Sequence, residues 1–264
     1  MSTELLALRA PLPRRLRPFF AVAAWALLLG AWCGLSYGGV VSPTFLPKPH
    51  EVVRGMLQLF YEKQMGLAIW TSTARIGKAF LLASALALPL GLAMGALEPV
   101  NRFFEPVMAP LRFMPISAFI PLLIVWFGID DAQKIAFLFL GVFVYLLPVV
   151  VNAVRAVPQE YVDTAYTLGA SRLQAVFTVL LPAALPEIVE AFRVMNAIAW
   201  TYIILAELVN AQSGIGYILS LAQSHLKPEW SFAGILVVGV IGILTDLGIR
   251  AINRLLFGWR DVDV

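Results

Sequence analysis

Charge, cysteine and histidine are scarce in this sequence. Lys, Arg, Asp and Glu make up 13% of the 264 residues and apolar residues 60%, whereas soluble globular domains are about a quarter charged and about half apolar. This composition excludes an ordinary soluble domain and predicts an integral membrane protein. The single cysteine, Cys33, excludes an intramolecular disulfide, and its apolar surroundings favour a small buried side chain over a reactive one.

The residue patterns of common catalytic and metal sites are also missing. The sequence has no glycine-rich phosphate loop ending in lysine, and its two histidines, His50 and His225, lack metal-ligand spacing. The net charge of +3 does not require a nucleic acid partner, because basic residues stand at the ends of apolar runs. We predict a chain that is not an enzyme and that has no catalytic residue, metal site or bound cofactor of its own.

Long apolar runs account for most of the chain. A helix needs about 20 apolar residues to cross about 30 Å of hydrocarbon, and each Lys, Arg or Asp at its centre costs about 2.5–3.5 kcal/mol. Six runs fit these conditions best: residues 19–37, 74–96, 107–127, 135–154, 188–208 and 230–252. The first run is longer than the core of a secretion signal and lacks a small-residue cleavage site, so we expect it to be retained. We therefore predict an all-α polytopic membrane protein in which residues 1–264 form one transmembrane domain.

Arginines at both ends of the chain predict its orientation, because positively charged segments stay in the cytoplasm. Four stand before or at the start of the first run and three in or after the last: Arg9, Arg14, Arg15, Arg17, Arg250, Arg254 and Arg260. Six spans return the chain to its starting side. Both termini are therefore predicted to be cytoplasmic, as is the segment between the fourth and fifth spans.

The second run carries a small residue at every fourth position: Ala79, Ala83, Ala87, Gly91 and Gly95. Residues four apart share one helix face, and small side chains let the backbone of a second helix approach closely. This face is predicted to pack against protein and not against lipid.

A polar segment with helical periodicity, residues 158–182, separates the fourth and fifth runs. Gly169 is expected to end a first short helix, and Ser171 to cap a second. Pro182 is expected to end that second helix, and Pro186 to open the fifth span. The pattern predicts a helical hairpin that is too small to fold alone but suited to filling a groove on a partner.

This segment resembles a known signature. Asp163-Thr164-Ala165, Gly169 and Val179-Leu180-Leu181-Pro182 have the spacing of the EAA signature of permease subunits in binding-protein-dependent ABC importers, which is Glu-Ala-Ala, three residues, Gly, nine residues and Ile-any-Leu-Pro. Asp163, Thr164 and Val179 are mild departures from it, and Thr164 bears on how closely the first helix packs.

Further stretches extend the resemblance over most of the chain. They are SPTFLPKP (residues 42–49), VWFGI (125–129), LGAS (168–171), LPAALPEI (181–188) and AELVNAQSGIGY (206–217). Together they are similar to the taurine, alkanesulfonate and nitrate branch of these permeases, and such a combination is more specific than one short motif.

The resemblance implies a type I importer permease with six transmembrane helices in the bacterial cytoplasmic membrane. It implies a homodimer, two cytoplasmic ATPase subunits that carry ATP and Mg²⁺, a periplasmic or lipid-anchored binding protein, and a small anionic solute that the sequence does not identify. It also implies that the hairpin is the helix that couples the permease to the ATPase. The implied coupling residues are Glu160, Asp163, Thr164, Ala165, Leu168, Gly169, Ala170 and Pro182.

The fifth span is implied to line the transport pathway. The candidates are Asn196, Trp200, Thr201, Tyr202 and Glu207. Consecutive helical residues point about 100° apart, so only some can face a lumen, and aromatic packing is the alternative. Glu207 either accepts hydrogen bonds from the loop at residues 213–216 or faces water.

Two pairs of opposite charge stand about one helical turn apart. Glu190 with Arg193, and Asp246 with Arg250, are predicted ion pairs near the cytoplasmic boundary. The alternative class, an ion-coupled secondary transporter, needs ionisable groups near the middle of the membrane, and the six runs place none convincingly there.

Overall fold

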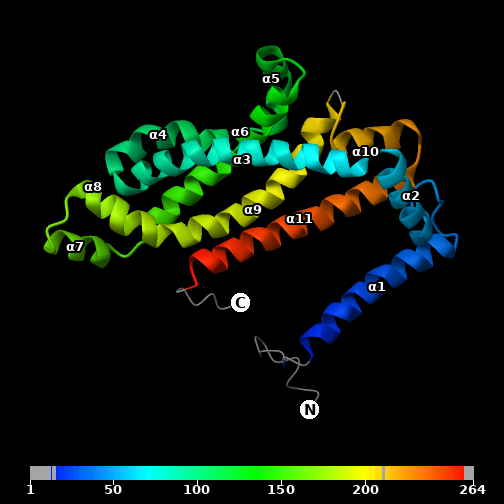
Figure 1. The fold of residues 1–264 in the computed structure, drawn as a ribbon, viewed down its shortest axis with the longest axis horizontal. Coiled ribbons are helices and arrows are strands. Elements are labelled where there is room, and N and C mark those ends of the chain that lie inside the picture. Colours follow the sequence, from blue (N-terminus) through cyan, green and yellow to red (C-terminus); the bar gives the residue numbers. More distant parts are fainter. Residues whose placement is uncertain (1–12, 14–15, 210–211, 259–264) are drawn as a thin grey trace.

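The computed structural model describes residue 13 and residues 16–209 and 212–258. The described residues form helices and no strands, so the all-α prediction is confirmed (Figure 1). The elements are α1 (Arg17–Tyr37), α2 (Pro49–Glu62), α3 (Met65–Ala96), α4 (Glu98–Leu111), η1 (Ile116–Phe119), α5 (Ile120–Phe127), α6 (Asp131–Arg155), α7 (Gln159–Thr167), α8 (Arg172–Ala175), η2 (Val176–Leu180), α9 (Leu181–Leu208), α10 (Ile215–Ser224) and α11 (Pro228–Leu256). Arg9, Arg14, Arg15 and Arg260, which carry much of the orientation argument, lie outside these ranges.

Helices α3, α6 and α9 form the centre of the molecule, and α11 packs on the far side of α9 (Figure 1). On α3, the small residues share one face: Ala79, Ala83 and Ala87 are fully buried. A Cβ atom added to Gly91 would lie 2.6 Å from Val150 of α6. The absence of a side chain therefore sets how closely these two backbones approach.

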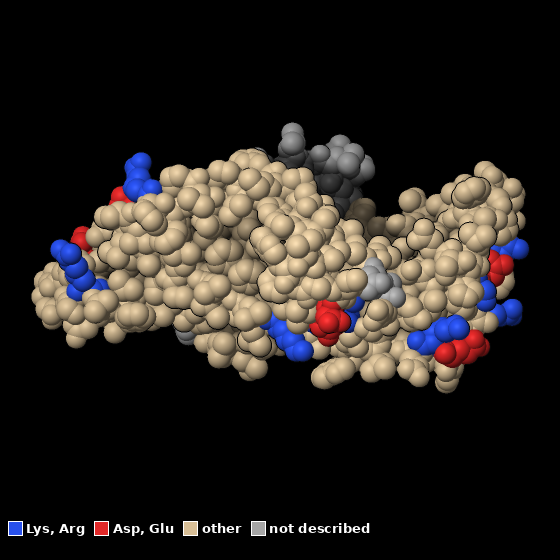
Figure 2. Space-filling model, turned by 90° about the horizontal axis from the view of Figure 1, so that it is seen from above, with Lys and Arg blue, Asp and Glu red and all other residues tan. Residues whose placement is uncertain are grey.

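The two ends of the bundle carry different elements. Helices α7 and α8 lie at one end, at the left of Figure 1, and α2 and α10 lie at the other. Figure 2 shows that the charged side chains on one face gather toward the ends and along one edge, leaving a broad uncharged surface between them. That distribution suits helices that cross a lipid bilayer.

Among the described residues, five helices are long and apolar enough to cross a membrane: α1, α3, α6, α9 with its preceding turns, and α11. The predicted span at residues 107–127 is not one straight helix, because α4 and the segment Ile116–Phe127 are bent by 89°. Pro115, which lies between the two segments, has an extended conformation with φ −62° and ψ 114°. The residue before a proline, here Met114, also disfavours the helical region. The described residues therefore contain five spans, or six if this bent pair is counted as one span.

The predicted end of the second hairpin helix at Pro182 is also wrong. A continuous helical path runs from Arg172 to Leu208. The turn η2 has π geometry, and the Leu181 N–H donates to the Val176 carbonyl, five residues earlier. This wider turn accommodates a proline ring that would collide with a carbonyl of a regular helix.

Helix α1 stands apart from the bundle and is held near its C-terminal end (Figure 1). Trp32 Nε1 donates to the Pro47 carbonyl at 2.9 Å, and its ring stacks on Phe232 at 6.0 Å. Most other α1 side chains are exposed. Lipid or a partner would have to cover them.

Candidate functional site

The turn of the hairpin between α7 and α8 follows from its local sequence. Gly169 has φ +86°, its N–H donates to the Tyr166 carbonyl, and the Ala170 N–H donates to the Ala165 carbonyl, both at 2.9 Å. This is the Schellman arrangement that ends a helix on glycine. Ser171 then caps α8, because its N–H donates to Gln174 Oε1 at 2.7 Å and its hydroxyl accepts from the Gln174 N–H. The predicted helix stop and cap are both confirmed.

The hairpin has a small interior of its own. Val162, Ala165 and Ala175 are buried together. Ala165 therefore joins the two helices and does not face outward. Asp163 and Thr164 are exposed but make contacts within α7, where Asp163 Oδ1 accepts from Gln159 and the Thr164 hydroxyl donates to the Glu160 carbonyl.

Large apolar side chains are exposed on the outer surface of this hairpin. Leu168 is 83% exposed, Leu173 71% and Phe177 58%. The continuous helix Arg172–Leu208 has 37 residues, which at 1.5 Å per residue is about 55 Å, and hydrocarbon is only about 30 Å thick. An upright helix of this length is longer than the hydrocarbon is thick, and an exposed apolar surface on a segment outside lipid would indicate a partner. Pro182 lies at the junction, in the first turn of α9.

Three of the pathway candidates lie together on a groove between α9 and α11. Asn196, Trp200 and Thr201 line it, and its volume is about 620 Å³. Asn196 Nδ2 and Trp200 Nε1 both donate to the Thr245 hydroxyl oxygen on α11, at 3.0 and 3.1 Å. Thr201 is exposed to the groove.

Tyr202 lies outside this groove, on the α6 side of α9. Its ring packs against Phe137 with centroids 5.8 Å apart, and a Cβ atom added to Gly141 would lie 2.5 Å from it. The structure therefore separates Tyr202 from the other pathway candidates of α9.

An ion-pair cluster joins α9 to α11 at the hairpin end of the groove. Arg193 Nε donates to Asp246 Oδ1 at 2.8 Å, and Arg193 also pairs with Glu190. Arg250 Nη2 lies 3.4 Å from Asp246 Oδ2. Both predicted pairs are confirmed, and Arg193 links them across the two helices. The Arg193 charge is thereby balanced by carboxylates.

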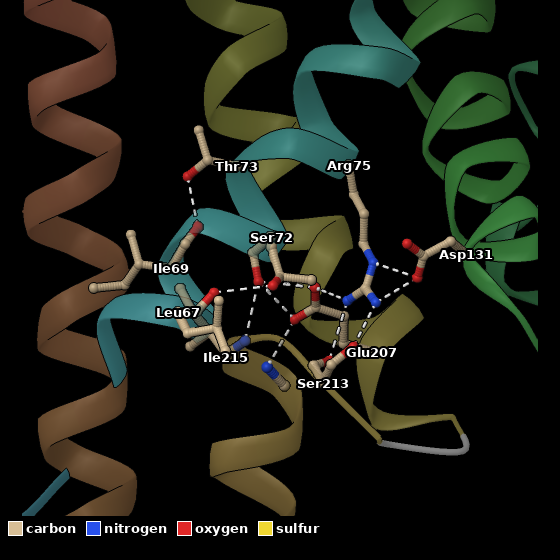
Figure 3. Close-up of polar contacts among 11 residues, drawn as sticks. Leu67, Ile69, Ser72, Thr73, Arg75, Asp131, Glu207, Ser213 and Ile215 are labelled. Atoms are coloured by element: carbon tan, nitrogen blue, oxygen red, sulfur yellow. Dashed lines mark hydrogen bonds and ion pairs between the residues drawn. The ribbon is translucent and has the colours of Figure 1, made fainter. Parts of the chain in front are cut away.

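Glu207 is fully buried, so the alternative in which it faces water is wrong. Its carboxylate accepts from the Gly216 N–H at 2.9 Å, which is the predicted bond to the loop (Figure 3). It also accepts from the Ser72 hydroxyl at 2.8 Å and from Arg75 Nη1 at 2.7 Å. The sequence alone did not predict that Arg75 pairs with Glu207. A basic residue and an acid within apolar runs were the available signal, because such groups usually pair.

Within the described ranges, no three His, Cys, Asp or Glu side chains are grouped as a metal site requires. His50 Nδ1 instead shares a 2.6 Å hydrogen bond with the Tyr37 hydroxyl.

Comparison with known proteins agrees with this geometry. Residues 87–258 match the family described as "Binding-protein-dependent transport system inner membrane component". The chain belongs to this family and is a permease subunit of an ABC importer.

Among curated relatives, the taurine transport system permease protein TauC of Escherichia coli (strain K12) is 32% identical over 98% of this chain and 96% of its own. The putative aliphatic sulfonates transport permease protein SsuC of Bacillus subtilis (strain 168) is 33% identical over 89% of this chain and 86% of its own. The nitrate import permease protein NrtB of Synechocystis sp. is 27% identical over 92% of this chain and 90% of its own. The chain therefore falls in the taurine, sulfonate and nitrate branch.

A solved structure of the MetNI methionine ABC transporter shares the fold, with a TM-score of 0.65. The match covers 74% of this chain and 98% of that chain at 20% identity. The fold is therefore that of a type I importer permease.

Proposed function

We propose that two copies of this chain form the pathway through which a small anionic solute enters the cell, driven by two ATPase subunits that dock on the hairpin of residues 158–182. The exposed apolar surface of the hairpin carries this proposal. Leu168, Leu173 and Phe177 project from a segment that is longer than lipid can cover. A groove on an ATPase would remove these side chains from water.

The orientation follows from the same proposal. The hairpin and both termini would be cytoplasmic, and the opposite end, with α2 and α10, would receive the solute from a binding protein. ATP and Mg²⁺ would bind to the ATPase subunits. The membrane would be the bacterial cytoplasmic membrane.

The groove between α9 and α11 is the proposed pathway within each protomer. Asn196, Trp200 and Thr201 supply amide, indole and hydroxyl groups along its wall. The Asn196 amide and the Trp200 indole donate to Thr245, and the Thr201 hydroxyl donates to the Ala197 carbonyl. An anion would contact these donors by replacing those bonds, which holds it less tightly than an unpaired arginine would. The relatives named for taurine, aliphatic sulfonates and nitrate suggest a solute with a sulfonate or a similar oxyanion group.

Reconstituted vesicles test the proposal directly. The permease, an ATPase subunit and a binding protein encoded beside it are combined, and uptake of labelled taurine, an alkanesulfonate and nitrate is measured. We expect uptake that requires ATP, the binding protein and the ATPase. Uptake by the permease alone under an ion gradient would instead show a secondary transporter.

A further inference from the structure

We infer that Arg75 is a positioning residue that fixes residues 213–216 against the bundle at the end opposite the hairpin. This inference rests on the proposed function, in which that end receives the binding protein. The loop enters α10, while Arg75 belongs to α3 and lies more than a hundred residues earlier in the chain.

Every N–H group of the Arg75 guanidinium has a partner (Figure 3). Nε donates to Asp131 Oδ1 at 3.0 Å, and Nη2 donates to the same carboxylate oxygen. Nη1 donates to Glu207 Oε1 at 2.7 Å and to the Ser213 carbonyl at 3.1 Å. Nη2 also donates to the Ser213 hydroxyl at 2.7 Å. One side chain therefore joins α3, α6, α9 and the loop, and a lysine could not reproduce its planar set of five donors.

Ser72 supplies a second link of the same kind, one helical turn before Arg75. Its hydroxyl donates to Glu207 and accepts from the Ile215 N–H at 3.0 Å. Two glycines leave room for the carboxylate: a Cβ atom on Gly214 would lie 2.2 Å from Glu207 Oε1, and one on Gly216 would lie 2.4 Å from Glu207 Cβ. In this position of the loop, Glu207 accepts from Ser72, Arg75 and the Gly216 N–H together.

Burial differs along the network. The side chains of Arg75 and Glu207 are 3% and 0% exposed, whereas that of Asp131 is 56% exposed. Breaking a buried charge pair leaves an unpaired charge and is costly, but the Asp131 contact can be removed at the surface. A partner that presses on residues 213–216 would therefore act on α3, α6 and α9 through one guanidinium.

The test uses the assembled complex with its binding protein. Arg75→Lys and Ser72→Ala break the network, and Thr73→Ala is the matched control, because the Thr73 hydroxyl donates only to the Ile69 carbonyl of its own helix. Basal ATPase, binding-protein-stimulated ATPase and uptake are measured for each. We expect Arg75→Lys and Ser72→Ala to lower stimulation and uptake by about tenfold with basal ATPase nearly unchanged, and Thr73→Ala to match the wild type.

A second measurement reports the position of the loop itself. In a Cys33→Ala background, Ile215→Cys places a thiol at a fully buried position. We expect a membrane-impermeant maleimide to label it about tenfold faster when Arg75→Lys or Ser72→Ala is also present, and at the background rate with Thr73→Ala.

The outcomes separate this inference from the proposed function. A wild-type complex without binding-protein-stimulated ATPase would contradict the proposed function. A working wild type whose Arg75→Lys and Ser72→Ala variants label and transport like Thr73→Ala would overturn the role of Arg75. If Arg75→Lys does not assemble, Ser213→Ala decides by the same two readouts, because it removes the Arg75 Nη2 bond to the Ser213 hydroxyl and leaves the buried pair of Arg75 and Glu207 in place.

Discussion

Gly169 is held in a backbone conformation that other residues adopt at a cost. Its φ is +86°, and a Cβ atom there would have no neighbour within 4 Å. We expect Gly169→Ala to strain the hairpin turn by about 1–2 kcal/mol through the backbone alone. ATPase retention on purification and uptake in vesicles should both fall.

Asparagine is the control at this position because it tolerates positive φ better than alanine does. Gly169→Asn should keep most of the coupling. Equal loss in both variants would show that the side chain, and not the backbone angle, is what the ATPase interface excludes.

Residue-scale predictions from the sequence succeeded where the chemistry was local. Gly169 and Ser171 act on neighbours within five positions, so spacing alone located the helix stop and the cap. Arg75 and Glu207 are 132 positions apart, and only the fold brings them together. The choice between the pathway and aromatic packing stayed open for Tyr202 for a related reason, because the side of α9 that faces α6 is set by packing and not by residue type.

Close packing of α3 on α6 yields a prediction at the scale of elements. Gly91→Ala would place Cβ 2.6 Å from Val150, and such overpacking costs about 1–3 kcal/mol. We expect a lower thermal unfolding midpoint in detergent.

The double variant Gly91→Ala with Val150→Ala should recover part of that loss. Gly77→Ala on the same helix meets no atom within 4 Å and should not destabilise. A midpoint for Gly91→Ala equal to that of Gly77→Ala would show that α3 and α6 are not in contact there.

The exposed apolar surface of the hairpin gives a second element-scale prediction. Leu168→Ser should weaken ATPase binding by about tenfold or more, since a central apolar anchor is removed. The matched control is Leu226→Ser, because Leu226 is 84% exposed and Leu168 83%, but Leu226 precedes α11 at the other end. Pull-down of the ATPase from detergent measures both variants. Equal retention in the two would exclude Leu168 from the interface.

Hydropathy located the helices but not their bends. Residues 107–127 form one apolar run in the sequence, and nothing in mean hydropathy records that the run turns by 89°. Pro115 and Pro182 look alike as helix breakers, yet the first accompanies a sharp bend and the second lies in a continuous helix after a π turn. Tertiary packing decides between these outcomes, because neighbouring helices must satisfy the freed backbone groups.

For the whole molecule, α9 connects the two ends at which partners are proposed. The hairpin precedes its first turn, and Glu207 stands one residue before its end. Its 28 residues span about 42 Å. Coupling between such distant sites requires two global states with different contacts at each. Arg193 with Asp246 near one end, and Arg75 with Glu207 near the other, are contacts that a rotation or shift of α9 would change.

The groove beside α9 supports a prediction about transport itself. Thr201 is exposed to the groove, so Thr201→Trp should fill part of its volume of about 620 Å³ without disturbing the core. We expect uptake to fall by about tenfold or more, because the indole ring would occupy space in the groove that the solute needs. ATPase retention and stimulated ATP hydrolysis should persist. Val194→Trp is the control on the same helix, since Val194 is 58% exposed and does not line the groove. Hydrolysis that continues without uptake would place the block in the pathway, whereas equal uptake in the two variants would place the solute elsewhere.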